Sequence, residues 1–135
     1  MNLLQQLKDK KYSILASNGY YSYESGIKPV IDRLNERIDY FMGLEVADKI
    51  IGKASAMLLT LSGVKSIDCM ILSASGKEIL DKYHIEYHYE QLVGYIINRK
   101  KDGMCPMEKT VESINDLKQA YEALNIKVKE LKNEK

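Results

Sequence analysis

The sequence lacks a marked excess of charge of either sign. Twenty lysine and arginine residues stand against nineteen aspartate and glutamate residues, which leaves a formal net charge of +1. Proteins that bind nucleic acid typically carry a clear basic excess, so this composition argues against nucleic acid as a partner. Long apolar runs are also missing, since the stretch 54–61 is short and interrupted by serine and threonine. The N-terminus has neither the basic flank nor the apolar core of a secretory signal, and we therefore expect a cytoplasmic protein with no membrane partner.

Cysteine is scarce as well, with only Cys69 and Cys105 in 135 residues and no C-x-x-C pair. In a reducing compartment both thiols are expected to be free. His84 and His88 lie in a strand-like alternation that sets them roughly 13 Å apart, too far to hold one small ion. The sequence therefore predicts no metal site and no cofactor. A hydrophobic content of 45% over this length is enough for one folded domain spanning residues 1–135 without disulfides or a structural metal.

The N-terminal part of the sequence contains the firmest local signal, a hairpin turn. Asn18-Gly19 tolerates the positive φ of a two-residue turn, and it separates the predicted strands 12–17 and 20–24. A short amphipathic helix is predicted before them over 2–10. A second helix is predicted to open at Pro29, a residue favoured in the first turn, and to end near Tyr40.

Apolar periodicity predicts the remaining elements. Apolar residues at spacings of three and four predict one long helix over 45–62, which Gly63 terminates. The sequence then predicts a strand over 66–72 that is apolar on both faces, a helix over about 74–83 and a strand over 85–89. Residues 91–98 give no assignment, and a long helix with a heptad-like stripe runs from about 106 almost to the end. This order predicts an α/β fold with one mixed sheet covered by helices on both faces.

Within the predicted helix 45–62, two lysines form the first candidate site. Lys49 and Lys53 would stack on one flank, with Asp48 on the opposite flank, near a helix N-terminus that favours anions. The alternative is that Glu45 pairs with Lys49 and that Lys53 simply faces water. The Gly52-Lys53 step does not make a phosphate loop, because Ala54 replaces the required hydroxyl residue.

The second candidate site is Cys105-Pro106-Met107-Glu108, where proline at the first helical position places Cys105 at the N-cap. A helix N-terminus can stabilise a thiolate, which would make Cys105 reactive. The alternative is a partly buried cap cysteine, with Glu108 satisfying N–H donors of the first turn.

Taken together, four segments resemble the signatures of a bacterial and archaeal family of unknown function that is assigned to the cytidine-deaminase-like superfold. The segments are Glu24-Ser25-Gly26 with Pro29, residues 47–54, Asn98-Arg99 and residues 105–108. The resemblance implies a three-layer αβα sandwich. Its active-site face would be built from the N-termini of two helices, here those starting near Val46 and Ala74.

Zinc deaminases of this superfold carry their metal ligands and a general acid–base glutamate at those two helix starts. This sequence has residues 46–49 at the first and residues 73–76 at the second, and neither segment contains a ligand set. The resemblance therefore implies a zinc-free pocket. Its candidate ligand-binding residues are Lys49, Lys53, Ser73, Ser75, Asn98 and Glu24, and its candidate catalytic residues are Cys105, Asp48 and Glu108.

Three functional hypotheses follow. The first is a protein that binds a small anionic or nucleotide-like molecule at the helix N-termini. The second is a metal-independent enzyme in which Cys105 or a lysine acts as nucleophile and Asp48 or Glu108 transfers protons. The third is a dimeric interaction module that self-associates through the stripe of the C-terminal helix, with Val128 and Leu131 as the discriminating residues.

Overall fold

A five-stranded mixed sheet forms the centre of the protein in the computed structural model, which describes residues 2–97, 101 and 103–133. The strand order is β2-β1-β3-β4-β5. The strands are β1 (Ile14–Ala16), β2 (Tyr21–Ser22), β3 (Glu45–Ile51), β4 (Ser66–Ser73) and β5 (Glu86–Val93). β1 pairs antiparallel with β2 and β3, whereas β3, β4 and β5 are parallel. The α/β class and the mixed sheet are as predicted, and the hairpin also forms, with shorter strands than expected.

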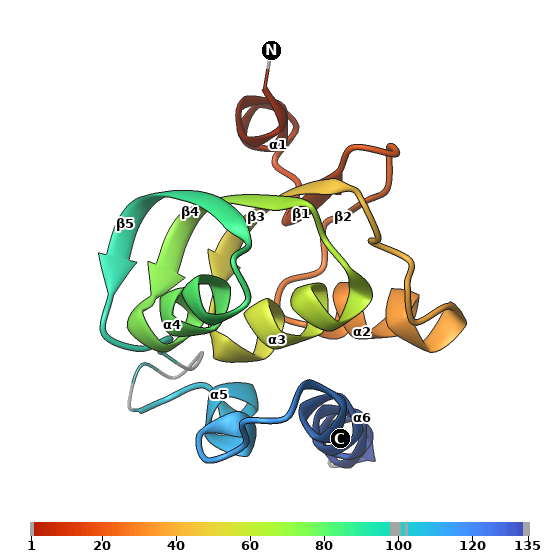
Figure 1. Cartoon of the computed structure of the whole chain (residues 1–135), viewed down its shortest axis with the longest axis vertical. Helices are drawn as coiled ribbons and strands as arrows, with labels where there is room; N and C mark the ends of the chain where they lie inside the picture. Colours follow the sequence, from red (N-terminus) through yellow and green to blue (C-terminus); the bar gives the residue numbers. More distant parts are fainter. Residues whose placement is uncertain (1, 98–100, 102, 134–135) are drawn as a thin grey trace.

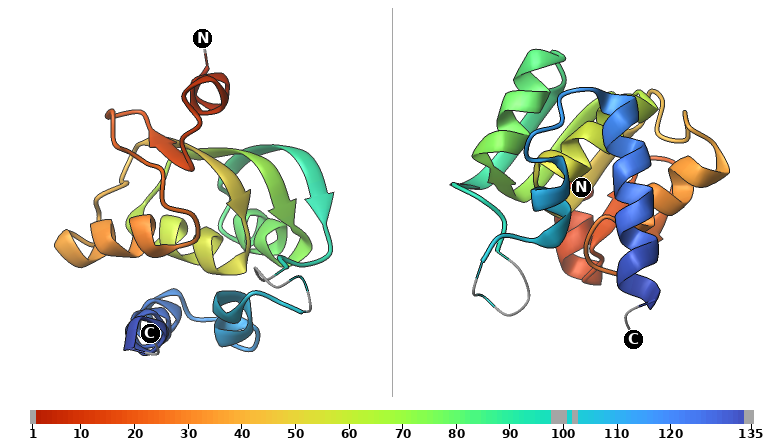
Figure 2. Two further views of the ribbon diagram at one scale, coloured as in Figure 1. Left: turned by 180° about the vertical axis from the view of Figure 1, so that it is seen from behind. Right: turned by 90° about the horizontal axis from the view of Figure 1, so that it is seen from below.

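Helices cover the two faces of the sheet unequally (Figure 1). Helix α1 (Leu3–Lys10) lies alone on one face, and α2 (Lys28–Glu36), α3 (Lys53–Ser62) and α4 (Ala74–Lys82) lie on the other. Two C-terminal helices, α5 (Pro106–Val111) and α6 (Leu117–Asn133), pack against α3 rather than against the sheet. This arrangement corrects the three-layer expectation, because α5 and α6 add a further layer outside α3, as Figure 1 and the left view of Figure 2 show. None of the described helices has the length and apolar character needed to span a membrane.

The predicted helix over 45–62 is wrong in its first half. Residues 45–51 form β3, which lies between β1 and β4, and the helix begins only at Lys53. Val46 and Ile51 contribute to the main core, whereas Ala47 faces α1 in a second, smaller core. Because β3 is a central strand with apolar residues on both faces, the spacing of these residues is the same as in the apolar stripe of a helix. Gly52, with φ −106° and ψ −171°, is the N-cap at which strand becomes helix.

The C-terminal helix predicted from about 106 is two helices, separated by residues 112–116. The carboxylate of Asp116 accepts a hydrogen bond of 2.8 Å from the main-chain N–H of Gln119, which starts α6 anew. Leu124 of the stripe is fully buried, as is the neighbouring Ala120, and Val128 packs against the same core. Much of the stripe therefore packs within the chain, and self-association through this helix stays a prediction.

The observed limits of two other elements differ from the predicted ones by a few residues. The helix opened by Pro29 ends at Glu36 rather than near Tyr40, because Arg37 is extended, with φ −159°. β5 continues to Val93, into the segment 91–98 that the sequence left unassigned. The predicted strand 66–72, the helix after it and the stop at Gly63, with φ +90°, are confirmed.

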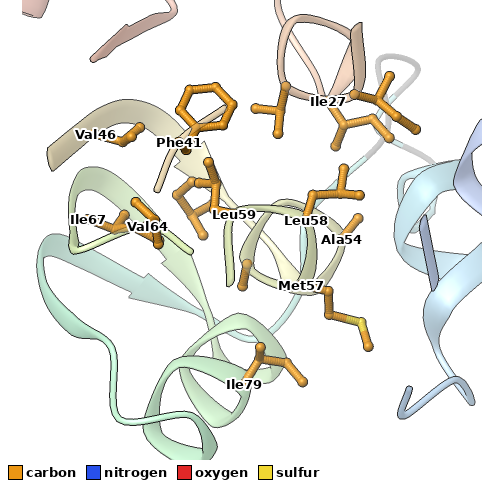
Figure 3. Packing of buried hydrophobic residues seen from close by; sticks show 14 of the residues in the cluster. Ile27, Phe41, Val46, Ala54, Met57, Leu58, Leu59, Val64, Ile67 and Ile79 are labelled. Atoms are coloured by element: carbon orange, nitrogen blue, oxygen red, sulfur yellow. The ribbon is translucent and has the colours of Figure 1, made fainter. Parts of the chain in front are cut away.

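Helix α3 is the centre of the main core. Its first turns and its middle are buried on all sides, including Ala54, Met57, Leu58 and Leu59. Figure 3 shows these side chains radiating from α3 in different directions, with Leu59 toward Phe41 and Leu58 toward Ile27. A helix that is apolar around its whole circumference is stable only when it is covered by other elements on every side.

Candidate functional site

The starts of α3 and α4 lie side by side at the carboxyl ends of β3 and β4. A Cβ placed on Gly76, in the first turn of α4, would lie 3.0 Å from the carbonyl carbon of Gly52 and 3.1 Å from its oxygen. The helix start expected near Ala74 is confirmed, with Ser73 as its N-cap. The other start lies at Lys53 rather than near Val46. The two helix termini converge as the resemblance implied, with different residues at the first of them.

A carboxylate from the same chain occupies the start of α3. Glu108 Oε1 accepts a hydrogen bond of 2.7 Å from the main-chain N–H of Lys53, and Oε2 accepts one of 2.9 Å from that of Ala54. Glu108 is only 7% exposed. The expectation that Glu108 satisfies N–H donors in the first turn of its own helix is wrong, because the donors that it satisfies belong to α3.

Gly52 provides the space for this carboxylate. A Cβ on Gly52 would lie 2.3 Å from Glu108 Oε1 and 2.5 Å from its Cδ, distances that no side chain tolerates. Glycine is required here for close approach rather than for a special φ. The sequence contained the signal, a glycine directly after a run of β-branched residues, but the helical interpretation of residues 45–62 concealed it.

Lys53 makes a second hydrogen bond to α5, through its side chain. Its Nζ donates a hydrogen bond of 3.1 Å to the main-chain carbonyl of Glu112, at the end of α5. Lys53 therefore contacts α5 through both its main chain and its side chain. No local pattern could have assigned this role to Glu112, because it supplies only a main-chain oxygen.

The serines of the second helix start lie as expected. Ser73 is fully buried, and its hydroxyl accepts a hydrogen bond of 3.0 Å from the N–H of Gly76. The hydroxyl of Ser75 lies 3.3 Å from that of Ser73. Two hydroxyl groups thus stand at the start of α4, next to Gly52.

Asp48 and Lys49 are not on a helix, which corrects both alternatives for this segment. They lie in β3, four and three residues before Gly52, and an extended chain covers roughly 13 Å over four residues. Lys49 therefore does not stack with Lys53, and the helical pair of Glu45 with Lys49 does not form either. Lys49 is exposed at its side chain, whereas its main-chain N–H donates to the carbonyl of Ser13 at 3.1 Å.

Asp48 is buried in β3, directly beside Cys69 of β4. Its Oδ1 accepts a hydrogen bond of 3.2 Å from the N–H of Ile50. Burial raises the pKa of the Asp48 carboxyl to about 8, so this group is largely protonated at neutral pH. Burial and the neighbouring Asp48 also raise the pKa of the Cys69 thiol, to about 12, which keeps it protonated. Burial raises the pKa of Glu108 as well, against the opposing effect of the N–H donors of Ala54 and Lys53.

Three predicted site residues remain, namely Cys105, Glu24 and Asn98. Cys105 is half-buried at the N-cap of α5, one turn before Glu108, and its N–H donates to the carbonyl of Ile96 at 2.9 Å. Glu24 is exposed, and its main-chain carbonyl accepts a hydrogen bond of 2.6 Å from the buried hydroxyl of Ser13. Asn98 lies outside the described residues. Within the described part of the chain, no three His, Cys, Asp or Glu side chains come together to form a metal site.

Comparison with known proteins identifies the family. The model of a domain of unknown function, DUF1893 or TM1506, matches residues 2–128. The chain belongs to the DUF1893 family. The crystal structure of a DUF1893 family protein from Thermotoga maritima, TM1506, is similar with a TM-score of 0.84 and 28% sequence identity, over 92% of this chain and 86% of that one. No curated protein matches significantly. The expected membership in a family of unknown function is thus confirmed, and the DUF1893 description assigns no ligand or reaction.

Proposed function

We propose that the protein binds a small molecule through a carboxylate or phosphate group at the start of α3, in the place that the Glu108 carboxylate takes. One observation carries the proposal: consecutive N–H groups of Lys53 and Ala54 hold both oxygens of a carboxylate, at 2.7 and 2.9 Å, in a space that Gly52 leaves open. Donors that hold one oxyanion in this way also suit another of the same shape. Glu108 is then an internal competitor of the ligand.

The surrounding residues fit the same role. Lys53 adds a cation at the helix start, and Ser73 and Ser75 offer hydroxyl groups at the adjoining start of α4. Ligand entry requires the first turn of α5 to withdraw from α3, which breaks the two Glu108 hydrogen bonds. Because α5 has only six residues, this displacement involves a short segment. Lys49, Glu24, Asn98 and Cys105 remain candidates for contacts with the rest of the ligand.

Inorganic phosphate is a suitable first probe of this site. We expect Glu108→Ala to bind phosphate at least about tenfold more tightly than the wild type, because the internal competitor is gone. Adding Lys53→Ala to that variant should weaken binding by about 1 to 3 kcal/mol, the range for a charged hydrogen-bond partner. Titrations followed by the amide NMR signals of Lys53 and Ala54 measure both effects at the donors themselves.

Glu112→Ala is the matched control, since Glu112 contacts Lys53 through its main-chain carbonyl alone. This variant should bind phosphate like the wild type. If Glu108→Ala is folded and the signals of Lys53 and Ala54 do not respond to phosphate, the proposed site is wrong.

We further propose that the fold is a zinc-free form of the cytidine-deaminase-like superfold. The convergence of the α3 and α4 starts on one edge of a mixed sheet supports this relation. With the start of α3 at Lys53, the two segments are 52–55 and 73–76, and neither contains a histidine, cysteine or glutamate. We expect purified protein to contain far less than one zinc per chain and to show no cytidine deamination. Elemental analysis that finds about one zinc per chain would contradict this.

A metal-independent enzyme is the second candidate, and one observation favours it. The pKa of Asp48, about 8, is suited to proton transfer near neutral pH. In this alternative Cys105 or a lysine is the nucleophile, and Asp48 or Glu108 transfers the proton. Ligand binding is the better supported function, because Asp48 lies roughly 13 Å back along β3 from the helix start.

A further inference from the structure

The edge strand β5 is long and uncovered. It spans eight residues, pairs with β4 on one side, and forms one end of the five-stranded sheet (Figure 1). Most of its residues are exposed, and the exposure includes Tyr89 at 40% and Leu92 at 45%. Monomeric proteins usually protect such an edge by a short strand, a bulge, a proline, charged side chains or a covering segment, and of these β5 carries charges at Glu86 and Glu90. β5 has neither a proline nor a short length to prevent pairing.

A second copy of the chain fits this edge in one register. Two β5 strands related by a two-fold axis pair antiparallel, and residues on the same sheet face must then oppose each other. The two-fold axis therefore passes between one residue and the same residue of the second copy. The central candidates for this residue are His88, Tyr89 and Glu90. These three registers differ sharply in the charges that they bring together.

Charge selects the register centred on Tyr89. With the axis at His88, Glu86 opposes Glu90, and with the axis at Glu90, that residue opposes itself. With the axis at Tyr89, His88 of each copy opposes Glu90 of the other, a carboxylate that already pairs with Lys8 of its own chain, so two complementary contacts form. Like charges directly opposite destabilise a strand pair, and opposite charges stabilise it.

The other contacts of this register are also compatible. Tyr89 opposes its own copy, Tyr87 opposes Gln91, and Glu86 opposes Leu92. Tyr89 already stacks on Tyr87, with ring centroids 6.4 Å apart and planes at 18°. Two such stacks meet at the axis and extend one aromatic surface across both copies.

We propose that two copies of the chain associate through β5, antiparallel about a two-fold axis at Tyr89, into one continuous ten-stranded sheet. The interface is formed by main-chain pairing of the edge and by the reciprocal His88–Glu90 contacts. It is separate from the predicted interface on α6 and from the site at the start of α3.

A charge swap measured by sedimentation equilibrium tests this register. The wild type should dimerise, and His88→Glu should raise the dissociation constant about tenfold or more, because it places glutamates opposite each other twice. The double variant His88→Glu with Glu90→His restores both complementary pairs, so its dissociation constant should return close to the wild-type value. A dimer that His88→Glu leaves unchanged, as an α6 interface would be, overturns the proposal. So does a wild-type chain that stays monomeric up to about 1 mM.

Cross-linking tests the axis itself, in a Cys69→Ala, Cys105→Ser background, because Cys69 of β4 is the direct neighbour of Tyr89 and would compete for the introduced thiol. Tyr89→Cys should form a covalent dimer on mild oxidation, since directly opposed Cβ atoms lie about 4.5 to 5.5 Å apart. Gln91→Cys is the matched control on the same face, because its own copy lies roughly 13 Å away in this register. Equal cross-linking of the two variants, or of neither, overturns the axis at Tyr89.

Discussion

Replacing Gly52 by alanine should destabilise the protein by about 2 to 4 kcal/mol, measured as the free energy of unfolding in urea. The main chain at Gly52, with φ −106° and ψ −171°, is accessible to alanine, so the cost does not come from backbone strain. It comes from the new Cβ, which would lie 2.3 Å from Glu108 Oε1. The carboxylate must leave, and the buried N–H groups of Lys53 and Ala54 then lose their acceptor.

A double-mutant cycle separates this clash from any other effect of the alanine. In a Glu108→Ala background, the carboxylate is already absent, and adding Gly52→Ala should cost less than about 1 kcal/mol. The interaction between the two positions is then most of the effect. Equal costs of Gly52→Ala in both backgrounds would show that the close contact with Glu108 does not determine the stability of this region.

Replacing Asp48 by asparagine should stabilise the protein at pH 8 by about 2 to 5 kcal/mol. The pKa of Asp48 is about 8 in the folded state, against about 3.9 in an unfolded chain. Between these values the folded state holds a proton that the unfolded state has released. The stability of the wild type therefore falls as the pH rises through this window, and the fall ends above the folded pKa. Asparagine carries no charge, and its carbonyl oxygen can accept the hydrogen bond from Ile50.

Urea unfolding at several pH values measures the difference between the two proteins. The advantage of Asp48→Asn should be largest at pH 8 and above, decline steadily toward lower pH, and nearly vanish around pH 4. Lys49→Gln is a useful companion, because it changes an exposed charge next to Asp48 and should alter this pH dependence only slightly. A pH-independent difference would mean that Asp48 ionises in the folded protein as it does in water.

The sequence predicted the second half of the sheet better than its centre. Residues 66–73 are bounded by Gly63 and by a serine N-cap, so both ends of β4 had local signals. Residues 45–51 follow Gly43 in the same way, but Gly52 at their end did not mark a boundary, because Ala47, Ile50 and Ile51 join Ala54 in a spacing that also suits a helix. In the structure Val46 and Ile51 belong to one core and Ala47 to a second core on the opposite face, whereas Ile50 is exposed. Periodicity alone does not distinguish that case from a buried helix, whereas the β-branched residues and Gly52 do.

The residues of the candidate site could be predicted from the sequence, but the contacts between them could not. Local patterns identified Lys53, Ser73 and Glu108 as polar groups at helix starts. The contact between Glu108 and Lys53 joins residues 55 positions apart in the chain. No local pattern contains that information, because it depends on how α5 packs over α3. The resemblance to a family placed both segments among its signatures and so pointed to one region.

The order of the elements along the chain has a consequence for synthesis. α3 ends at Ser62, but the helix that covers its outer surface, α6, is complete only at Asn133. At about 5 to 20 residues per second, translation needs about 4 to 14 s to supply those 71 residues. During this interval the sheet, α2 and α4 can shield only part of α3, and its outer apolar surface remains available to chaperones or to other nascent chains.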